Sequence, residues 1–174
     1  DAASEFKTRV EQDEPHPVLE GRTLGMVFEK PSTRTRLSFE TGMTQLGGHA
    51  IFLGPDDIGL GEREPLKDTA RTLSRYVDCA MVRLFSHSDL EEFTAHASIP
   101  VINGLTDDAH PCQTLADLLT IRETVGFDSQ VAWVGDGNNV AHSLLLAGAL
   151  LVMIGLAVNV WGGWLFGRLR LARV

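Results

Sequence analysis

The 174-residue sequence predicts an α/β fold in which a parallel sheet is flanked by helices. Three observations support this class. Short apolar runs of the kind found in buried strands alternate along the chain with stretches that have helical spacing. Turn-forming Gly, Pro, Asn and Asp residues separate the two kinds of segment. Hydrophobic residues make up 44% of the chain, which is enough for one good core or two small ones.

The first strand and the first helix of this pattern are expected on either side of Pro31. Residues 23–28 are mostly apolar and favour β-structure. Pro31 stops that strand, and Ser32 is a suitable N-cap for the segment that follows. Apolar residues then recur at helical spacing until Gly47 and Gly48 end the helix.

The later elements repeat the alternation of strand and helix. Strands are expected at 50–53, 79–83, 100–103 and 130–134, a loop at 54–61, and helices from Pro65, Ser88, His110 and Val140. Residues 126–128 indicate a boundary between a first domain, 1–125, and a partial second domain, 126–174. Since parallel strands end at one edge of a sheet, the loops that follow them should form the ligand site.

Residues 32–36 predict an anion site at the start of the first helix after a strand. The junction exposes backbone N–H groups at the positive end of the helix dipole. The sequence adds the hydroxyls of Ser32, Thr33 and Thr35 and the guanidinium groups of Arg34 and Arg36. Arginine recognises phosphate or carboxylate oxygens with two parallel hydrogen bonds. The alternative is an ordinary capped helix whose two arginines are solvated.

Other polar residues are expected at the same edge of the sheet. Arg83 ends one strand, His110 and Gln113 open the helix after the next, and Asn138 and Asn139 follow the last. Taken singly, Arg83 could be a surface charge and His110 a simple helix cap. Their convergence on one edge favours a shared site.

Several common site types are not predicted. The segment 135–137 (GDG) lacks the third glycine of a dinucleotide fingerprint, so NAD binding is not expected. The sequence has no zinc-ligand spacing, Walker loop or serine nucleophile elbow.

The distribution of charge along the chain indicates which classes of partner are expected. Residues 1–142 carry 12 basic and 23 acidic side chains, a net charge of −11, whereas 143–174 carry +3. An acidic body disfavours nucleic acid as a partner, and basic residues within it indicate a focused anion pocket. Cys79 and Cys112 have no CxxC spacing, and the N-terminus lacks the pattern of a signal peptide. We therefore expect a cytoplasmic protein.

The last part of the chain allows two interpretations. Residues 144–167 form an uncharged run of 24 residues that ends before Arg168, long enough to span a membrane. The other interpretation divides the run into a buried helix, 144–151, and a parallel strand, 156–160, and its five glycines favour this one. A truncated or frame-shifted C-terminus would then leave the aromatic residues after 160 without a partner layer.

Four segments resemble the signatures of ornithine carbamoyltransferase, in the family's order and at its spacing. They are 28–36 (FEKPSTRTR), 67–71 (KDTAR), 110–113 (HPCQ) and 135–139 (GDGNN). The resemblance covers roughly residues 1–151. Aspartate carbamoyltransferases share the Ser-Thr-Arg core, but Lys30, the 67–71 stretch and the paired asparagines favour the ornithine type.

The resemblance implies that the carbamoyl group of carbamoyl phosphate passes to the side-chain amine of ornithine, giving citrulline and phosphate in arginine biosynthesis or catabolism. It implies a first domain that binds carbamoyl phosphate and a second that binds ornithine. It also implies a homo-oligomer built on trimers with active sites between subunits, and no metal or organic cofactor.

The same resemblance assigns roles to the candidate site residues. The phosphate would be held by Ser32, Thr33, Arg34 and Thr35, the carbamoyl oxygen by Thr35, Arg83 and His110, the carbamoyl amide by Gln113, and ornithine by Asn139. Arg34, Arg83 and His110 would be catalytic, because stabilising a developing oxyanion and a departing phosphate is an electrostatic task.

The sequence departs from the family in three respects. Gly59 stands where the family usually has a glutamine that reaches a neighbouring subunit's phosphate site. The family's later ornithine-binding and catalytic-cysteine motifs are not found in these residues, and Cys112 is not that cysteine. After about Leu151 the sequence no longer follows the family. Three alternatives therefore stay open: a carbamoyl phosphate-binding fragment without turnover, an aspartate-type enzyme and a membrane-anchored protein.

Overall fold

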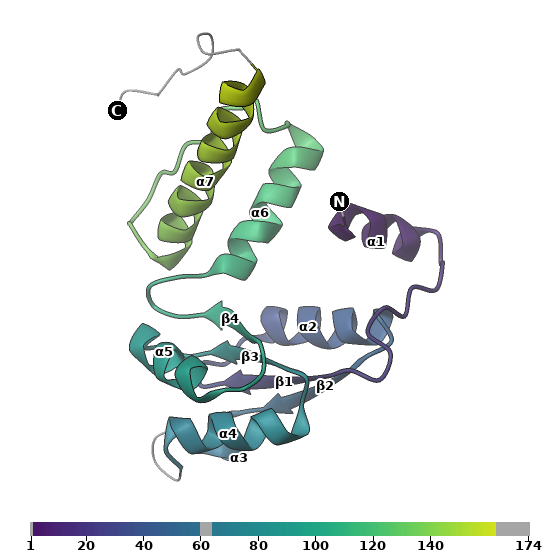
Figure 1. The fold of residues 1–174 in the computed structure, drawn as a ribbon, viewed down its shortest axis with the longest axis vertical. Coiled ribbons are helices and arrows are strands. Elements are labelled where there is room, and N and C mark those ends of the chain that lie inside the picture. The colour runs from purple at the N-terminus through teal and green to yellow at the C-terminus, as the bar shows by residue number, and fades with distance from the viewer. Residues whose placement is uncertain (1, 60–63, 163–174) are drawn as a thin grey trace.

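A four-stranded parallel sheet forms the centre of the molecule (Figure 1). The computed structural model describes residues 2–59 and 64–162. The strands run in the order β2-β1-β3-β4, with bounds β1 (Thr23–Phe28), β2 (His49–Leu53), β3 (Cys79–Arg83) and β4 (Val101–Leu105). The predicted α/β class with a parallel sheet is confirmed.

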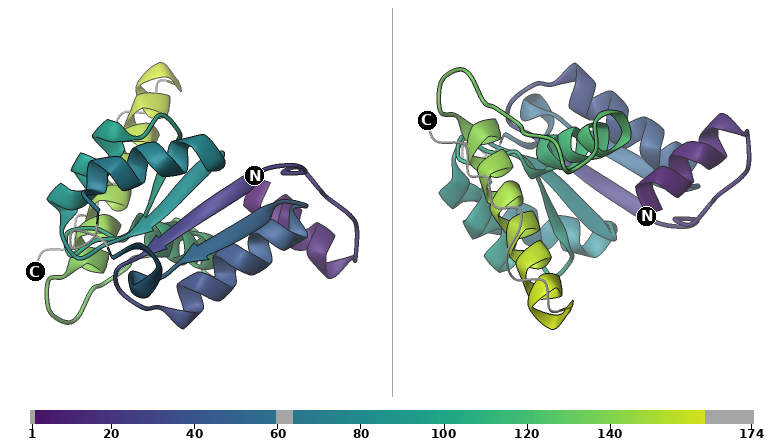
Figure 2. Two further views of the ribbon diagram at one scale, coloured as in Figure 1. Left: turned by 90° about the horizontal axis from the view of Figure 1, so that it is seen from below. Right: turned by 90° about the horizontal axis from the view of Figure 1, so that it is seen from above.

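Helices lie on both faces of this sheet. Their bounds are α1 (Ala2–Glu11), α2 (Thr33–Gln45), α3 (Pro55–Ile58), α4 (Leu66–Tyr76), α5 (His87–His96), α6 (Pro111–Thr124) and α7 (Asn139–Gly162). The pair α4 and α5 packs on one face and α2 on the other. Figures 1 and 2 show α1, α6 and α7 on the same side of the sheet as α2. An ion pair between Lys7 and Glu123, at 2.6 Å, joins α1 to α6.

The core explains why the first strand could be recognised from the sequence. Met26 and Phe28 of β1 pack toward α2, whereas Val27 packs toward α4 and α5. Side chains alternate between the two faces of a strand, and here both faces are covered. A strand buried on both faces has a nearly continuous apolar sequence, and residues 23–28 have this pattern.

Two local boundaries differ from the prediction. The expected loop at 54–61 contains the short helix α3, because Pro55 suits a first helical position and the Asp57 carboxylate accepts a hydrogen bond from the Gly54 amide at 2.8 Å. Helix α5 begins at His87 instead of Ser88, since the Ser86 hydroxyl caps it by accepting the Asp89 amide at 3.2 Å.

The expected strand at 130–134 is wrong. These residues form no strand, and Val134 is 95% exposed. Within 2–59 and 64–162 no other strand lies beside this segment, so its backbone has no ladder to join. An apolar sequence alone therefore did not produce a strand here.

The expected strand at 156–160 is also wrong, because helix α7 runs without a break to Gly162. The residues that lead into it, 144–151 (LLLAGALL), are mostly strong helix formers, and a short apolar run cannot be assigned to helix or strand by its periodicity. Residues 163–167 of the uncharged run lie outside the described residues. In the part of the chain that the structure describes, no helix is both long enough and apolar enough to cross a bilayer.

Candidate functional site

The candidate site lies where the strands end, at the carboxyl edge of the sheet. In the parallel register Phe28 of β1 pairs with Arg83 of β3, and Arg83 pairs with Leu105 of β4. The loops that follow these three strands therefore begin side by side. They lead to the first turns of α2, α5 and α6.

The first turn of α2 forms the predicted anion cradle. Ser32 is its N-cap in an extended conformation, with φ −157° and ψ 108°. The Ser32 hydroxyl accepts a hydrogen bond from the Thr35 amide at 3.4 Å and donates to the Thr35 hydroxyl at 3.0 Å. Thr33 and Arg34 are exposed on the same turn. A helix of 13 residues thus presents its N-terminal amides and two linked hydroxyls to the edge of the sheet.

The two arginines of this turn have different surroundings. Arg36 donates from Nε to Glu40 Oε1 at 2.9 Å, and its guanidinium lies 3.9 Å from the centroid of the Phe52 ring. Arg36 therefore has a partner on its own helix, because side chains four residues apart on a helix face each other. Arg34 makes no ion pair within the described residues and remains available to an anion.

Arg83 is a buried cation at the end of β3. It is 8% exposed, and its Nε donates to the backbone oxygen of Lys30 at 3.1 Å. Burial lowers the pKa of the guanidinium, which nevertheless stays charged at neutral pH. No carboxylate of the described residues forms an ion pair with it. A buried charge without a partner is costly, so this position is suited to an anionic ligand.

Glu29 ties the loop that carries the cradle to the loop that follows Arg83. Its amide donates to the Arg83 backbone oxygen at 2.9 Å, and its carboxylate accepts the Phe85 amide at 2.7 Å. The Lys30 ammonium lies 5.0 Å from the centroid of the Phe85 ring. Sequence reasoning did not select Glu29, although its place directly after β1 could have indicated it.

His110 precedes the first residue of α6, and its side chain does not cap that helix. Its Nδ1 is buried, with no hydrogen-bond partner in the described residues. Burial lowers the pKa of the imidazole, the positive charge of Arg83 lowers it further, and Asp117 partly opposes both. The ring is therefore neutral at pH 7 and can donate a hydrogen bond to an oxygen. His110 thus occupies the N-cap position, as the alternative of a helix cap expected, but its imidazole makes no capping hydrogen bond.

Gln113 and Asn139 bond to neighbouring groups. The Gln113 amide donates to Asp117 one turn along α6, at 2.9 Å. The Asn139 amide, in the first turn of α7, donates to the backbone oxygen of Thr106 at 2.7 Å. The structure thus gathers the cradle, Arg83 and His110 at one edge, with Asn139 bonded to the loop that leads to His110 and Gln113 bonded along its own helix.

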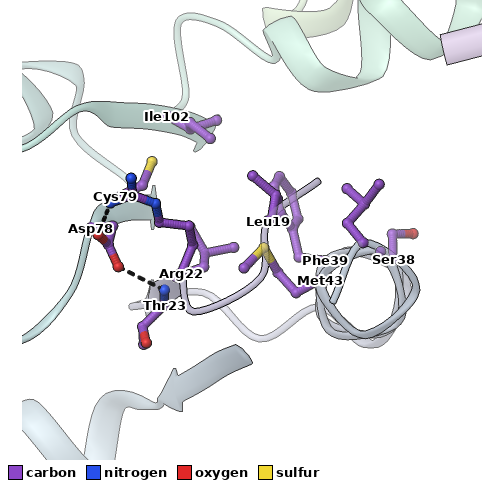
Figure 3. Close-up of a pocket in the computed structure, with 12 residues that line it drawn as sticks. Leu19, Arg22, Thr23, Ser38, Phe39, Met43, Asp78, Cys79 and Ile102 are labelled. Carbon is purple, nitrogen blue, oxygen red and sulfur yellow. Dashed lines mark hydrogen bonds and ion pairs between the residues drawn. The ribbon is translucent and has the colours of Figure 1, made fainter. Parts of the chain in front are cut away.

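A separate hollow of about 570 Å³ lies at the opposite edge of the sheet (Figure 3). Its lining is mainly apolar and includes Phe39, Met43 and Ile102. Asp78 accepts hydrogen bonds at its rim from Arg22 at 2.7 Å and from the Thr23 amide at 2.8 Å. None of the candidate site residues lines this hollow.

Comparison with known proteins shows the family of the chain. Residues 1–123 match the family described as aspartate/ornithine carbamoyltransferase, carbamoyl-P binding domain. The chain belongs to this family. The cradle, Arg83 and His110 all lie within the matched residues.

Individual relatives agree with the family. The chain is 71% identical over 142 residues to an ornithine carbamoyltransferase of Haloquadratum walsbyi, covering 80% of this chain and 46% of that protein. It is 57% identical over 150 residues to one from Halalkalibacterium halodurans, covering 84% and 47%. The chain thus spans about half the length of the curated relatives it matches.

Solved structures show the same fold. The ornithine carbamoyltransferase of Pyrococcus furiosus superposes with a TM-score of 0.81 at 54% identity, covering 84% of this chain and 47% of that one. The catalytic subunit of aspartate transcarbamoylase from M. jannaschii gives a TM-score of 0.76 at 37% identity, covering 85% and 50%. Identity is thus higher to the ornithine enzyme.

Gly59 has a backbone conformation that is unusual for residues other than glycine. It ends α3 in the left-handed conformation, with φ 56° and ψ 47°. A residue with a side chain adopts that conformation at a cost of roughly 1 kcal/mol. The position therefore suits glycine in this chain.

Proposed function

We propose that this chain carries the carbamoyl phosphate half of an ornithine carbamoyltransferase active site. The observation that carries the proposal is Arg83, a buried cation that lacks a carboxylate partner in the described residues and lies at the same sheet edge as the Ser32–Thr35 cradle. The buried Nδ1 of His110, which has no partner there either, adds a neutral donor or acceptor to the same edge.

The phosphate of carbamoyl phosphate would occupy the cradle. Backbone amides at the start of α2, the hydroxyls of Ser32, Thr33 and Thr35, and the guanidinium of Arg34 would bind its oxygens. The carbamoyl oxygen would then lie toward Arg83, His110 and Thr35. The carbamoyl amide would be bound by Gln113, which requires its side chain to leave Asp117.

The reaction would need no covalent enzyme intermediate. The neutral side-chain amine of ornithine attacks the carbonyl carbon, a C–N bond forms, and the carbonyl oxygen becomes negatively charged. The C–O bond to phosphate then breaks, phosphate leaves with the electron pair, and one proton passes from the amine nitrogen to the departing phosphate, giving citrulline. Arg83 and neutral His110 would stabilise the oxyanion, and Arg34 the leaving phosphate. Placement of both substrates would supply much of the remaining acceleration.

The ornithine side of the site is proposed to involve Asn139 in a second domain that begins after residue 125. The amide of Asn139 uses one of its two N–H groups on Thr106, so a second group remains to contact an amino acid. By resemblance, the complete enzyme would be a trimer-based homo-oligomer of the cytoplasm that makes or degrades arginine. Aspartate-type chemistry is less well supported, because identity to the solved aspartate enzyme is 37% against 54% for the ornithine enzyme.

A carbamoyl phosphate-binding fragment without turnover is the second candidate function. This chain covers close to half of the relatives' length, so the assay below also tests binding without turnover. Both candidates predict that the chain binds carbamoyl phosphate.

Calorimetry with carbamoyl phosphate, run beside a citrulline-formation assay, separates the candidates. Binding with citrulline formation supports the enzyme, and binding without it supports the fragment. Absence of carbamoyl phosphate binding contradicts both. Aspartate in place of ornithine is the control for amine specificity.

A further inference from the structure

The loop that carries His110 is held by the first turn of α7. At one end of the loop the Asn139 side chain donates to the Thr106 backbone oxygen at 2.7 Å. At the other end the His110 amide donates to the Ser143 hydroxyl at 2.8 Å. Asn139 and Ser143 are four residues apart, so both face the loop. Figure 1 shows this turn of α7 beside the connection from β4 to α6.

The direction of the hydrogen bond to Ser143 is fixed by chemistry. The single hydroxyl proton of Ser143 is donated to the Asn139 backbone oxygen at 2.9 Å. Its lone pairs therefore face the His110 amide as acceptors. Ser143 is 9% exposed, so water has little access to replace it. Loss of this acceptor would leave the His110 amide without its partner.

The backbone of His110 is constrained from both sides. Its amide is bound by Ser143, and Pro111 follows it, which disfavours the helical conformation for His110. The observed angles are φ −137° and ψ 68°. A fixed amide and a restricted ψ together determine where the Cα–Cβ bond points, and hence where the imidazole lies.

We propose that Ser143 is a positioning residue for His110, acting from the first helix after the predicted domain boundary on the carbamoyl phosphate site. This inference rests on the proposed function, because the role of Ser143 in binding carbamoyl phosphate requires that His110 belongs to that site. Its structural content, that the Ser143 hydroxyl sets the place of the His110 ring, can be measured without any ligand.

The chain contains a matched control for this interaction. Ser74 in α4 donates from its hydroxyl to the Ala70 backbone oxygen at 2.7 Å and accepts the Ser98 amide at 3.0 Å. This is the same pair of bonds that Ser143 makes. Ser98 lies before β4, at the amino edge of the sheet, away from His110. Substitution of Ser74 thus removes equivalent bonds without touching the site.

The decisive measurement is the titration of the His110 ring by NMR, assigned with His110→Gln. In the 174-residue chain we compare Ser143→Ala, Ser143→Thr, which keeps a hydroxyl, and Ser74→Ala. The ring is influenced by its burial, by Arg83 and by Asp117. Ser143→Ala should move the pKa of His110 up toward its ordinary value, because a released ring gains water. Ser143→Thr and Ser74→Ala should leave it in place.

Carbamoyl phosphate affinity gives the second readout. Ser143→Ala should weaken binding by roughly tenfold, the effect of losing one good hydrogen bond at the site. Ser74→Ala should change it by less than about twofold while lowering the melting temperature to a similar extent. If Ser143→Ala does not fold, Ser143→Cys replaces it, because cysteine has a similar volume but its sulfur is a weak hydrogen-bond acceptor. The pKa of His110 in Ser143→Cys should then rise by less than a complete loss of the hydrogen bond would produce.

The outcomes separate this inference from the proposed function. Equal losses of stability in Ser143→Ala and Ser74→Ala, with the His110 titration unchanged in both, overturn the positioning role. An unchanged His110 pKa in Ser143→Cys, where that variant is needed, does the same. If the unsubstituted chain binds no carbamoyl phosphate but Ser143→Ala alone moves the pKa of His110, the positioning role stands and the proposed function fails.

Discussion

The sheet and the segment after α6 contain similar residues in different surroundings. Val27 in β1 is completely buried between two layers of helices, whereas Val134 is 95% exposed. Both belong to apolar runs that predict a strand. The first run has neighbouring strands on both sides, and the second has none within the described residues. Partners elsewhere in the chain, more than local sequence, decide whether such a run becomes a strand.

The same contrast recurs within the candidate site. Arg36 has its partner, Glu40, one turn away, whereas Arg34 makes no ion pair in the described part of the chain. The buried Nδ1 of His110 likewise has no hydrogen-bond partner there. Buried side-chain oxygens of Thr69, Asn103 and Thr114 also lack a partner in the described residues. The carboxyl edge differs because it combines such a group with two cations, Arg34 and Arg83, that form no ion pair there.

Hydrogen exchange should show the largest difference between the two apolar runs. Amides of 24–28 lie in a central strand with ladders on both sides and should exchange only on global unfolding. Amides of 131–134 should exchange close to the rate of an unstructured peptide, about a thousandfold faster or more. Comparable protection of both segments in this chain would contradict the contrast drawn above.

Two phenylalanines test the energetic side of the same contrast. Phe28 is fully buried in the core beneath α2, whereas Phe127 is 52% exposed. Phe28→Ala should lower the free energy of unfolding by about 3–5 kcal/mol. Phe127→Ala should change it by roughly 0.5 kcal/mol. Urea unfolding of the two variants measures both values, and a large loss for Phe127→Ala would reveal packing that its exposure does not suggest.

Two arginines of one helix turn test the contrast between matched and unmatched cations. Arg34→Ala should weaken carbamoyl phosphate binding by about a hundredfold, because it removes charge-assisted hydrogen bonds to the phosphate. Arg36→Ala removes an exposed ion pair and should cost roughly 0.5 kcal/mol of stability, with little change in affinity. Calorimetry on both variants, with thermal melts as the folding control, decides the assignment. Equal affinities in the two variants would remove Arg34 from the site.

Much of the fold was predictable because the two central strands, β1 and β3, are covered on both faces. Residues 23–28, 50–53 and 79–83 coincide closely with β1, β2 and β3. The failures lie at 130–134, where no partner strand is present among the described residues, and at 156–160 (LAVNV), which continues a helix that began at Asn139. The presence of a partner strand, and the continuation of an earlier helix, both depend on residues outside the five of each run.

The candidate site was predictable to the extent that its residues follow strands directly. Ser32, Arg83 and His110 were selected in this way. Glu29 and Ser143 were missed because each acts through a backbone amide distant in the chain, that of Phe85 or of His110. Such contacts depend on which loops lie side by side in the folded chain, and the spacing of residues along the sequence does not give this information. Ser143 stands four residues after Asn139, a helical interval that could have pointed to it.

The pH dependence of stability should show the smallest effect, and its sign follows from the burial of His110. Burial and the Arg83 charge lower the pKa of His110 in the folded chain below its ordinary value of 6.5. Between these two pKa values the unfolded chain binds more protons than the folded chain, so stability rises with pH. The contribution is therefore complete above about pH 7 and declines as the pH falls through 6.5.

The comparison variant is His110→Gln, which keeps a polar side chain but does not titrate in this range. Carboxylates contribute equally to both proteins, so the difference between their melting temperatures isolates the imidazole. As the pH is lowered from 7.5 to 5.5, the melting temperature of the unsubstituted chain should fall more than that of His110→Gln. A constant difference would mean that the imidazole is as hydrated in the folded chain as in the unfolded one. The carboxyl edge would then lack the buried, unmatched nitrogen that distinguishes it from the rest of the sheet.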